Sequence, residues 1–275
     1  MINENVPQID IKEILYKKAP SAAKKVPEFL INYLKRTIHQ DEINYILREY
    51  KDLDGVDFMK ALIKYFGITI NPNGLENIPT DKRYIFASNH PLGGLDGICL
   101  SALIGEKFDN NILYLVNDLL LFIPNLQSIF IPINKHGAQS KRNATLIDNA
   151  YSSDKQILTF PAGLCSRKEN GVISDLEWKK SFIQKSVEYK RDIVPVFFEG
   201  KNSNFFYNID KLRKFVGIKF NVAMIYLPDE MFCSKQKVFN VYFGKPIPWQ
   251  TFDKTRKADE WAKEVRNIVY NLKAK

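Results

Sequence analysis

Several features are missing from this 275-residue sequence, and each absence excludes a class of protein. No apolar run approaches the roughly 20 residues that cross a bilayer as a helix, so no membrane-spanning helix is expected. The start, residues 1–5, lacks a basic stretch followed by an apolar one, so no secretory signal peptide is expected. The cysteines are few and contain no C-x-x-C pair, which excludes a disulfide framework or zinc cluster and fits a reducing compartment: Cys99, Cys165 and Cys233.

Two kinds of catalytic site are also missing. There is no G-x-S-x-G motif, so a serine hydrolase is disfavoured. The three histidines, His39, His90 and His136, are scattered without the spacing of metal ligands, so no metal site is expected.

Positive charge is in excess, and it is unevenly distributed. The chain has 40 Lys and Arg against 31 Asp and Glu, a net charge of +9. Residues 1–80 hold 11 basic and 11 acidic residues, so the whole excess follows residue 80. Such a body attracts phosphate, acidic lipid headgroups, acidic carrier proteins or nucleic acid. Few aromatic residues interleave with the basic runs and no RNA-binding signature is present, so nucleic acid is not an expected partner.

A turn-rich stretch at residues 71–74 divides the chain into two predicted parts. Residues 1–72 form an N-terminal helical segment, with apolar stripes that predict helices at 10–16, 27–39, 42–50 and 56–66. The lysine-rich stretch 16–25, beside the apolar stripe of 27–39, either contacts an anionic membrane or is a solvated loop. Residues 73–275 form an α/β domain, in which a central sheet is flanked by helices.

The pattern of the second part alternates short β-rich runs with amphipathic stretches. Strands are predicted at 84–87, 112–116, 129–133, 156–160, 193–198, 220–225 and 238–243. Helices are predicted at 97–104, 141–152, 178–189, 209–215 and 254–272.

The most informative motif is S-N-H-P-L-G-G-L-D-G at residues 88–97, between a predicted strand and a predicted helix. Ligands bind at this end of strands in open α/β sheets. His90 and Asp96 would point about 240° apart on one helix, but the intervening proline and glycines favour a loop that folds the carboxylate back. A carboxylate on one ring nitrogen fixes the tautomer, so that the other nitrogen accepts a proton from a hydroxyl or amine. A purely structural turn is the alternative interpretation.

Two further segments carry candidate binding residues. F-P-A-G-L-C-S-R-K at 160–168 follows a strand, and its turn with Gly163, Ser166 and Arg167 suits an anion such as phosphate or carboxylate. Lys135 and Arg142 flank the start of a helix and either bind phosphate or are solvated. For residues 160–168 the alternative is an exposed basic turn.

Two other segments each allow two interpretations. Cys165 stands near Arg167, whose charge would lower the thiol pKa; it is either a nucleophile or a small apolar residue. The run L-L-L-F-I-P at 119–124 either lines an apolar tunnel for an acyl chain or packs in the core.

Taken in order, these blocks resemble the glycerolipid (lysophospholipid) acyltransferase superfamily. That superfamily has N-H-x4-D, a basic block with arginine, F-P-E-G-T-R-S-R and V-P-x in the same sequence. Here the blocks are Asn89-His90 with Asp96, the basic segment, residues 160–167 and V-P-V at 194–196. The similarity spans roughly residues 80–245, and the ordered set is more specific than any single block.

The resemblance implies a mechanism and a set of partners. His90 would be the general base, Asp96 its orienting residue, and the 163–167 turn the anion site for the acceptor. The donor would be acyl carrier protein or acyl-CoA, with no resident cofactor, and the acceptor a lipid or lysolipid. The enzyme would act as a peripheral protein on an anionic membrane surface, at the cytoplasmic face of the inner membrane. The fold would be a mixed sheet flanked by helices.

Three departures from the superfamily blocks narrow the range of expected acceptors. Five residues rather than four separate His90 and Asp96, Ala162 replaces the usual glutamate, and Leu164-Cys165 replace Thr-Arg. A hemolysin-like bacterial subgroup, some of whose members acylate ornithine or glycine lipids, resembles this chain in these respects. The expected acceptor is therefore an amino-acid-containing lipid. The alternatives are 1-acylglycerol-3-phosphate acylation in phospholipid synthesis and a non-catalytic basic module that binds membranes.

Overall fold

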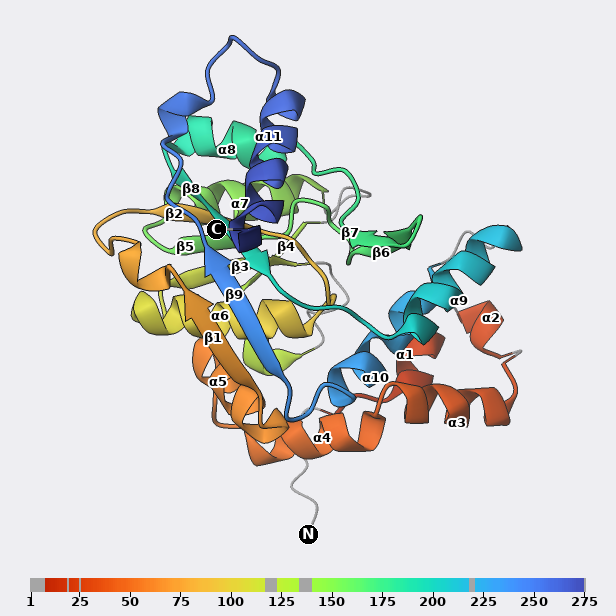
Figure 1. Cartoon of the computed structure of the whole chain (residues 1–275). Coiled ribbons are helices and arrows are strands. Elements are labelled where there is room, and N and C mark those ends of the chain that lie inside the picture. The colour runs from red at the N-terminus through yellow and green to blue at the C-terminus, as the bar shows by residue number, and fades with distance from the viewer. Residues whose placement is uncertain are drawn as a thin grey trace.

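A seven-stranded sheet is the centre of the computed structural model (Figure 1). The structure describes residues 8–18, 20–24, 26–116, 123–133, 140–217 and 221–274, without the side chains of 18, 22, 23, 140–143 and 274. The strand order is β1-β9-β8-β2-β5-β3-β4. The strands are β1 (Thr69–Asn73), β2 (Tyr84–Ser88), β3 (Ile112–Val116), β4 (Phe130–Pro132), β5 (Gln156–Thr159), β8 (Asp192–Phe198) and β9 (Val238–Phe243).

The sheet is mixed, as the sequence predicted. Strands β8, β2, β5, β3 and β4 are mutually parallel, and β1 is parallel to β9. The direction reverses between β8 and β9, which pair antiparallel. Strands β2, β3 and β5 are buried along their whole length. Continuous burial is typical of parallel strands with helices on both faces.

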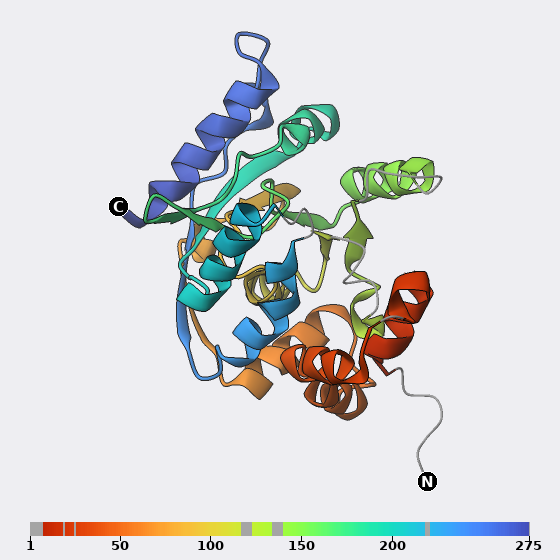
Figure 2. The same ribbon diagram turned by 90° about the vertical axis from the view of Figure 1, so that its right-hand side faces the viewer.

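Helices cover both faces of this sheet (Figure 2). Alternate residues of β2 point into two different cores: Tyr84 and Phe86 into one, Ile85 and Ala87 into the other. The first core is closed by α5 (Gly55–Phe66) and α6 (Leu95–Lys107), and the second by α7 (Ser140–Ser152), α8 (Ser181–Tyr189) and α11 (Ala258–Tyr270).

A third group of helices lies beside the sheet, on the right of Figure 1. It combines the N-terminal helices with a late segment of the chain, and His39 joins the two through a 2.8 Å contact of its Nε2 with Asp229. The members are α1 (Ile11–Lys18), α2 (Pro20–Ala23), α3 (Glu28–Thr37), α9 (Asn204–Phe215), the 3-10 helix η4 (Val222–Tyr226) and α10 (Leu227–Phe232). Helix α4 (Gln40–Glu49) lies next to α5 and packs Ile46 and Leu47 into the first core (Figure 1). The four helices expected in residues 10–66 are therefore confirmed, while the domain boundary near residue 72 stays a prediction.

Three segments differ from expectation. The strand predicted at 220–225 is wrong, because residues 222–226 form η4, whose Ala223 packs on Phe206 and Tyr207 of α9. Residues 69–73 form an edge strand that includes most of the turn-rich stretch expected at 71–74. Pro72 is tolerated there because an edge strand has one side without a partner. A hairpin, β6 (Arg167–Glu169) with β7 (Val172–Ser174), was not foreseen. No helix among the described residues combines the length and apolar character that a bilayer crossing needs.

Candidate active site

The loop between β2 and α6 brings His90 and Asp96 together. His90 Nδ1 lies 3.0 Å from Asp96 Oδ2, and the aspartate is fully buried at the first turn of α6. The histidine side chain keeps 13% of its surface exposed, whereas that of Asp96 is fully buried. The loop expected from the proline and glycines is therefore present.

Asp96 also shapes the loop that carries the histidine. Its Oδ2 accepts hydrogen bonds from the backbone N–H groups of Leu92 at 2.9 Å and Gly93 at 3.3 Å, and its Oδ1 accepts one from Gly97 at 2.9 Å. Gly93 has a φ of +76°, a backbone conformation that favours glycine. The buried carboxylate is thus held by backbone donors as well as by the imidazole, which fixes the ring orientation.

Aromatic rings form the floor beneath the imidazole. The His90 ring stacks on Phe160 with centroids 4.0 Å apart, and Phe160 in turn meets the edge of Tyr114 at 5.5 Å. A Cβ atom on Gly97 would lie 2.4 Å from Tyr114 Oη, so α6 approaches β3 as closely as glycine allows. The His90 ring therefore packs on Phe160, just after β5, and contacts Asp96 at the start of α6.

Opposing influences set the pKa of His90. Burial of the ring is the largest and lowers the pKa, but the carboxylates of Asp96 and then Asp175 outweigh it, and the pKa lies above its ordinary value of 6.5. The carboxylate thus stabilises the imidazolium. A ring that donates from Nδ1 to Asp96 presents Nε2 as its proton acceptor, which is the geometry of a general base.

A second buried carboxylate, that of Asp175, accepts a hydrogen bond from the backbone of the loop that carries His90. Its Oδ1 accepts the backbone N–H of His90 at 3.1 Å and the hydroxyl of Ser166 at 2.6 Å, and its Oδ2 accepts the indole N–H of Trp178 at 2.9 Å. The N–H of Ser166 donates to the carbonyl of His90 at 2.7 Å. Sequence reasoning missed Asp175; its one local signal is the placement three residues before Trp178.

The expected anion-binding residues fall in two environments. Ser166 is 2% exposed and joins the His90 loop through Asp175, whereas Arg167 is 3% exposed and faces α9. The Arg167 guanidinium donates to the carbonyl of Cys165 at 2.8 Å and pairs with Asp210 at 3.4 Å. Gly163 has a φ of +71°, and the place of a Cβ on it lies 2.6 Å from the ammonium of Lys179. Their role in binding an acceptor stays a prediction.

The remaining candidates are described only in part. Lys135 lies outside the described residues, as do residues 119–122 of the 119–124 segment. Arg142 belongs to α7, but its side chain is not among those described.

Cys165 differs from expectation. Its sulfur lies 2.9 Å from Arg167 Nη1, yet the residue is 4% exposed, and burial outweighs the arginine and raises the pKa of the thiol. The expected lowering of the Cys165 pKa is therefore wrong. Loss of water around the thiolate raises this pKa by more than the positive charge of Arg167 lowers it.

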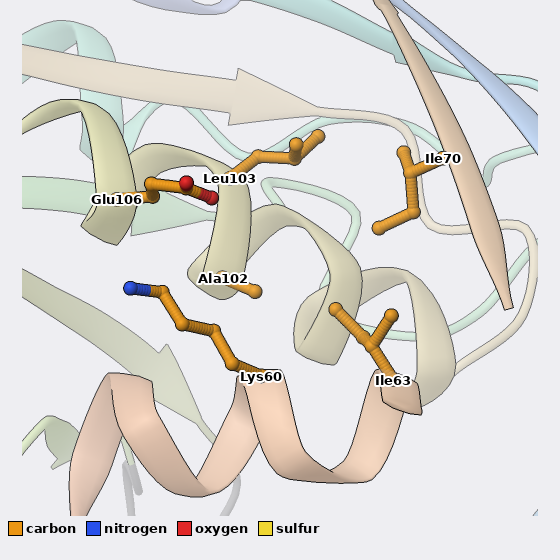
Figure 3. Close-up of a pocket in the computed structure, with 6 residues that line it drawn as sticks. All are labelled: Lys60, Ile63, Ile70, Ala102, Leu103 and Glu106. Atoms are coloured by element: carbon orange, nitrogen blue, oxygen red, sulfur yellow. The ribbon is translucent and has the colours of Figure 1, made fainter. Parts of the chain in front are cut away.

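A separate cavity of about 210 Å³ lies between α5, α6 and β1 (Figure 3). Its lining residues on α6 lie in the second half of the helix, about 9–15 Å along the axis from Asp96 at 1.5 Å per residue. The cavity is therefore distinct from the His90 site. Its lining residues are Lys60, Ile63, Ile70, Ala102, Leu103 and Glu106.

Comparisons with known proteins identify the family of this chain. The model of the acyltransferase family matches residues 13–275. A lyso-glycine lipid O-acyltransferase of Bacteroides thetaiotaomicron is 50% identical over 272 residues, which cover 99% of this chain and 100% of that protein. A second enzyme of the same name, from Phocaeicola vulgatus, is 47% identical over 272 residues, which cover 99% of this chain and 98% of that protein.

A solved structure is also similar. The crystal structure of the 1-acyl-sn-glycerophosphate acyltransferase PlsC from Thermotoga maritima has a TM-score of 0.49 and 15% sequence identity, over 88% of this chain and 96% of that one. The family match spans nearly the whole sequence, and the two curated relatives do the same. The chain therefore belongs to the acyltransferase family and is an enzyme of acyl transfer, as the resemblance of its ordered sequence blocks predicted.

Proposed function

We propose that this chain transfers a fatty acyl group from an acyl thioester to the hydroxyl of a lyso-glycine lipid, with His90 as general base. The contact of His90 Nδ1 with the buried Asp96 at 3.0 Å carries the catalytic part of this proposal. The acceptor is inferred from the two relatives, which bear the name lyso-glycine lipid O-acyltransferase and align over almost their full lengths.

The reaction needs one proton carrier. With Nδ1–H donating to Asp96, Nε2 of His90 takes the proton of the acceptor hydroxyl while its oxygen attacks the thioester carbonyl. Collapse of the tetrahedral intermediate forms the ester and breaks the carbon–sulfur bond. The imidazolium then returns its proton to the departing thiolate. Asp96 stabilises the transient imidazolium and keeps the ring in the required tautomer.

Charge supports the choice of substrates. Acyl carrier protein and acyl-CoA, the candidate donors, are both anionic, and the chain has a net charge of +9. The acceptor carries the carboxylate of glycine, and the chain has Ala162 where the superfamily has an acidic residue. We place this carboxylate beside the turn of Gly163, Ser166 and Arg167, outside the buried pairs that Ser166 makes with Asp175 and Arg167 with Asp210. We also expect peripheral action at the cytoplasmic face of the inner membrane, with no resident cofactor.

An assay with the purified chain tests the proposal. Lyso-glycine lipid is incubated with acyl carrier protein or CoA carrying a fatty acyl group, and the product is identified by mass spectrometry while thiol release is followed. We expect O-acylated glycine lipid from the wild type and a fall in kcat of about 10²–10⁴-fold for His90→Gln. Lysophosphatidate is the competing acceptor, and a product from it alone would contradict the proposed acceptor.

The chain offers a matched control for the histidine. His39 also contacts a carboxylate, Asp229, at 2.8 Å, but this pair joins the N-terminal helices to α10. His39→Gln is expected to keep wild-type turnover. Unchanged turnover by His90→Gln would remove the general base from the mechanism.

A further inference from the structure

The loop between β8 and α9, residues 199–203, carries a buried polar side chain with an unused donor. Asn202 is 6% exposed, and its amide Nδ2 has no hydrogen-bond partner among the residues that the structure describes. Nearly all buried polar groups of folded proteins are hydrogen-bonded, because burial removes the water that would otherwise bind them. An unpaired buried amide beside a catalytic site is therefore a candidate for contact with substrate.

The backbone around Asn202 is held by other contacts. Its N–H donates to the hydroxyl of Tyr207 at 3.2 Å, and the N–H of Ser203 donates to the carboxylate of Glu230 at 2.8 Å. The Ser203 hydroxyl also donates to Glu230, and it accepts the N–H of Phe206 in the first turn of α9. The position of Asn202 is thus fixed without its side-chain amide, which leaves that amide available to a ligand.

This loop packs against the catalytic loop, residues 88–97. The two loops follow the carboxyl ends of neighbouring parallel strands, β8 and β2, where ligands bind in open sheets. The place of a Cβ on Gly200 is 3.3 Å from Leu92 Cδ2. The side chain of Asn89 donates to the carbonyl of Phe198 at 2.9 Å and accepts its N–H at 2.7 Å. The unused amide is therefore carried by a loop that is fixed to the catalytic one.

Tyr207 connects Asn202 with the turn expected to bind the acceptor. Its hydroxyl accepts the backbone N–H of Asn202, and its ring belongs to a buried cluster that contains Cys165 of that turn. The place of a Cβ on Gly93, in the catalytic loop, is 3.0 Å from Cys165 Cβ. Asn202, the turn and the catalytic loop therefore form one contiguous region at the carboxyl edge of the sheet.

The polar side chains of the turn already have partners within the protein. The Ser166 hydroxyl donates to Asp175 at 2.6 Å. The Arg167 guanidinium pairs with Asp210 at 3.4 Å. A carboxylate bound beside this turn needs a further donor, and Asn202 carries one. The terminal torsion of an asparagine side chain is broad, so the amide can rotate toward a bound group while the backbone stays in place.

We propose that the amide of Asn202 donates a hydrogen bond to the glycine carboxylate of the lysolipid acceptor and thereby selects its headgroup; the inference rests on the proposed function for the identity of the acceptor. A hydrogen bond to an ionised carboxylate is about twice as strong as one between neutral groups. A neutral amide suits the single charge of a carboxylate, whereas phosphate is usually bound by arginine or lysine.

Steady-state kinetics of Asn202→Leu test the assignment, because this change removes the donor at similar size. The KM for lyso-glycine lipid is expected to rise about tenfold or more, while the KM for the acyl donor keeps its wild-type value. The methyl ester of the acceptor lacks the carboxylate charge, so its KM is expected to be raised in wild type and similar in the variant. Equal KM values of wild type and variant for lyso-glycine lipid would overturn the inference.

Thermal unfolding without substrate separates binding from a structural role. The unpaired amide makes no hydrogen bond that holds the fold, so Asn202→Leu is expected to melt at or above the wild-type temperature. Asn125 is the matched control: it is 9% exposed, and its Nδ2 donates to the carbonyls of Tyr50 at 3.0 Å and Leu53 at 2.7 Å. Asn125→Leu is expected to melt lower and to keep the wild-type KM. The reverse pattern, with Asn202→Leu melting lower at unchanged KM, would make Asn202 structural.

A competing acceptor tests selectivity and separates the two proposals. The preference for lyso-glycine lipid over lysophosphatidate, as a ratio of kcat/KM values, is expected to fall about tenfold in Asn202→Leu. An unchanged ratio, with wild type active on lyso-glycine lipid, overturns the role of Asn202 and leaves the proposed function standing. A wild type that acylates no lyso-glycine lipid refutes the proposed function, and the assignment of a glycine carboxylate to Asn202 with it.

Discussion

The backbone N–H of His90 donates a hydrogen bond to the carboxylate of Asp175 at 3.1 Å, across 85 residues of sequence. The same carboxylate accepts from Ser166 and Trp178, so one buried group ties together the loop after β2, the loop after β5 and the start of the segment that leads into α8. Asp175 is 4% exposed, and its hydrogen bond with His90 is made by the backbone N–H rather than by the imidazole. It is therefore a positioning residue.

Asp175→Asn is expected to lower kcat about 10–100-fold through misplacement of His90, because an amide offers one accepting oxygen to three donors. The KM for the acyl donor is expected to change little. The pH profile separates this role from a loss of fold: Asp175 is one of the groups that raise the pKa of His90, so the variant's apparent pKa should fall. A wild-type kcat with a wild-type pH profile would contradict the role.

The pH dependence of kcat/KM tests the pairing of His90 with Asp96. The base must be neutral, and its pKa is raised above 6.5, so activity is expected to fall as the pH drops through an apparent pKa above 6.5. In Asp96→Asn the main opposing charge is gone and burial dominates. The apparent pKa should then lie below that of the wild type, with kcat lower as well. If the pH profile of Asp96→Asn were unshifted, the group that titrates in kcat/KM would not be His90.

The same pairing predicts a stability difference that depends on pH. The pKa of His90 is higher in the folded state than its ordinary value of 6.5. The charged pair therefore stabilises the fold fully below pH 6.5, and this contribution disappears as the pH rises through the folded-state pKa. In urea unfolding, the difference in free energy between wild type and Asp96→Asn is expected to shrink over that range. A difference that grows with pH would reverse the sign of the assignment.

The approach of α6 to β3 predicts the effect of one methyl group. Gly97→Ala would bring a Cβ within 2.4 Å of the buried Tyr114 hydroxyl, and overpacking of this kind costs about 1–3 kcal/mol of unfolding free energy. Gly94→Ala is the control, because a Cβ there meets nothing within 4 Å. Denaturant unfolding of the two variants should differ accordingly; equal stability would mean that β3 moves aside at no cost.

The burial of Cys165 predicts that it takes no covalent part in acyl transfer. Its pKa is raised and it is 4% exposed, so Cys165→Ala is expected to retain wild-type kcat. In the native protein, a maleimide should label the exposed Cys233 rather than Cys165. Loss of turnover in Cys165→Ala, with an unchanged melting temperature, would indicate an acyl-enzyme intermediate.

Patterns among neighbouring residues were sufficient to predict most strands of the sheet and the contact between His90 and Asp96. Strands β2, β3, β5 and β8 are short apolar runs bounded by turns, so their burial can be read from neighbouring residues. His90 and Asp96 are six residues apart, and the proline and glycines between them permit only a few loop shapes. The closeness of the two side chains could therefore be predicted without knowledge of the rest of the chain.

The structure of residues 69–73 and 222–226 depends instead on partners that are far away in the sequence. Residues 69–73 are polar and carry a proline, and they become a strand only because β9 lies alongside, where Asn71 donates to Asn240 at 3.1 Å across 169 residues. The apolar run at 222–226 has strand composition, but the face it covers belongs to α9.

The same division holds at the active site. The amino-acid sequence by itself determined the acyltransferase blocks, the mixed α/β sheet and the His90–Asp96 loop, because each depends on residues close together in the chain. Only the tertiary structure assigned Asp175 to the histidine loop, turned Arg167 toward Asp210 of α9, and brought Tyr33 of α3 against Tyr226 of η4. Those relationships arise from side chains that meet across many residues of chain, and burial and charge there depend on what else packs beside them.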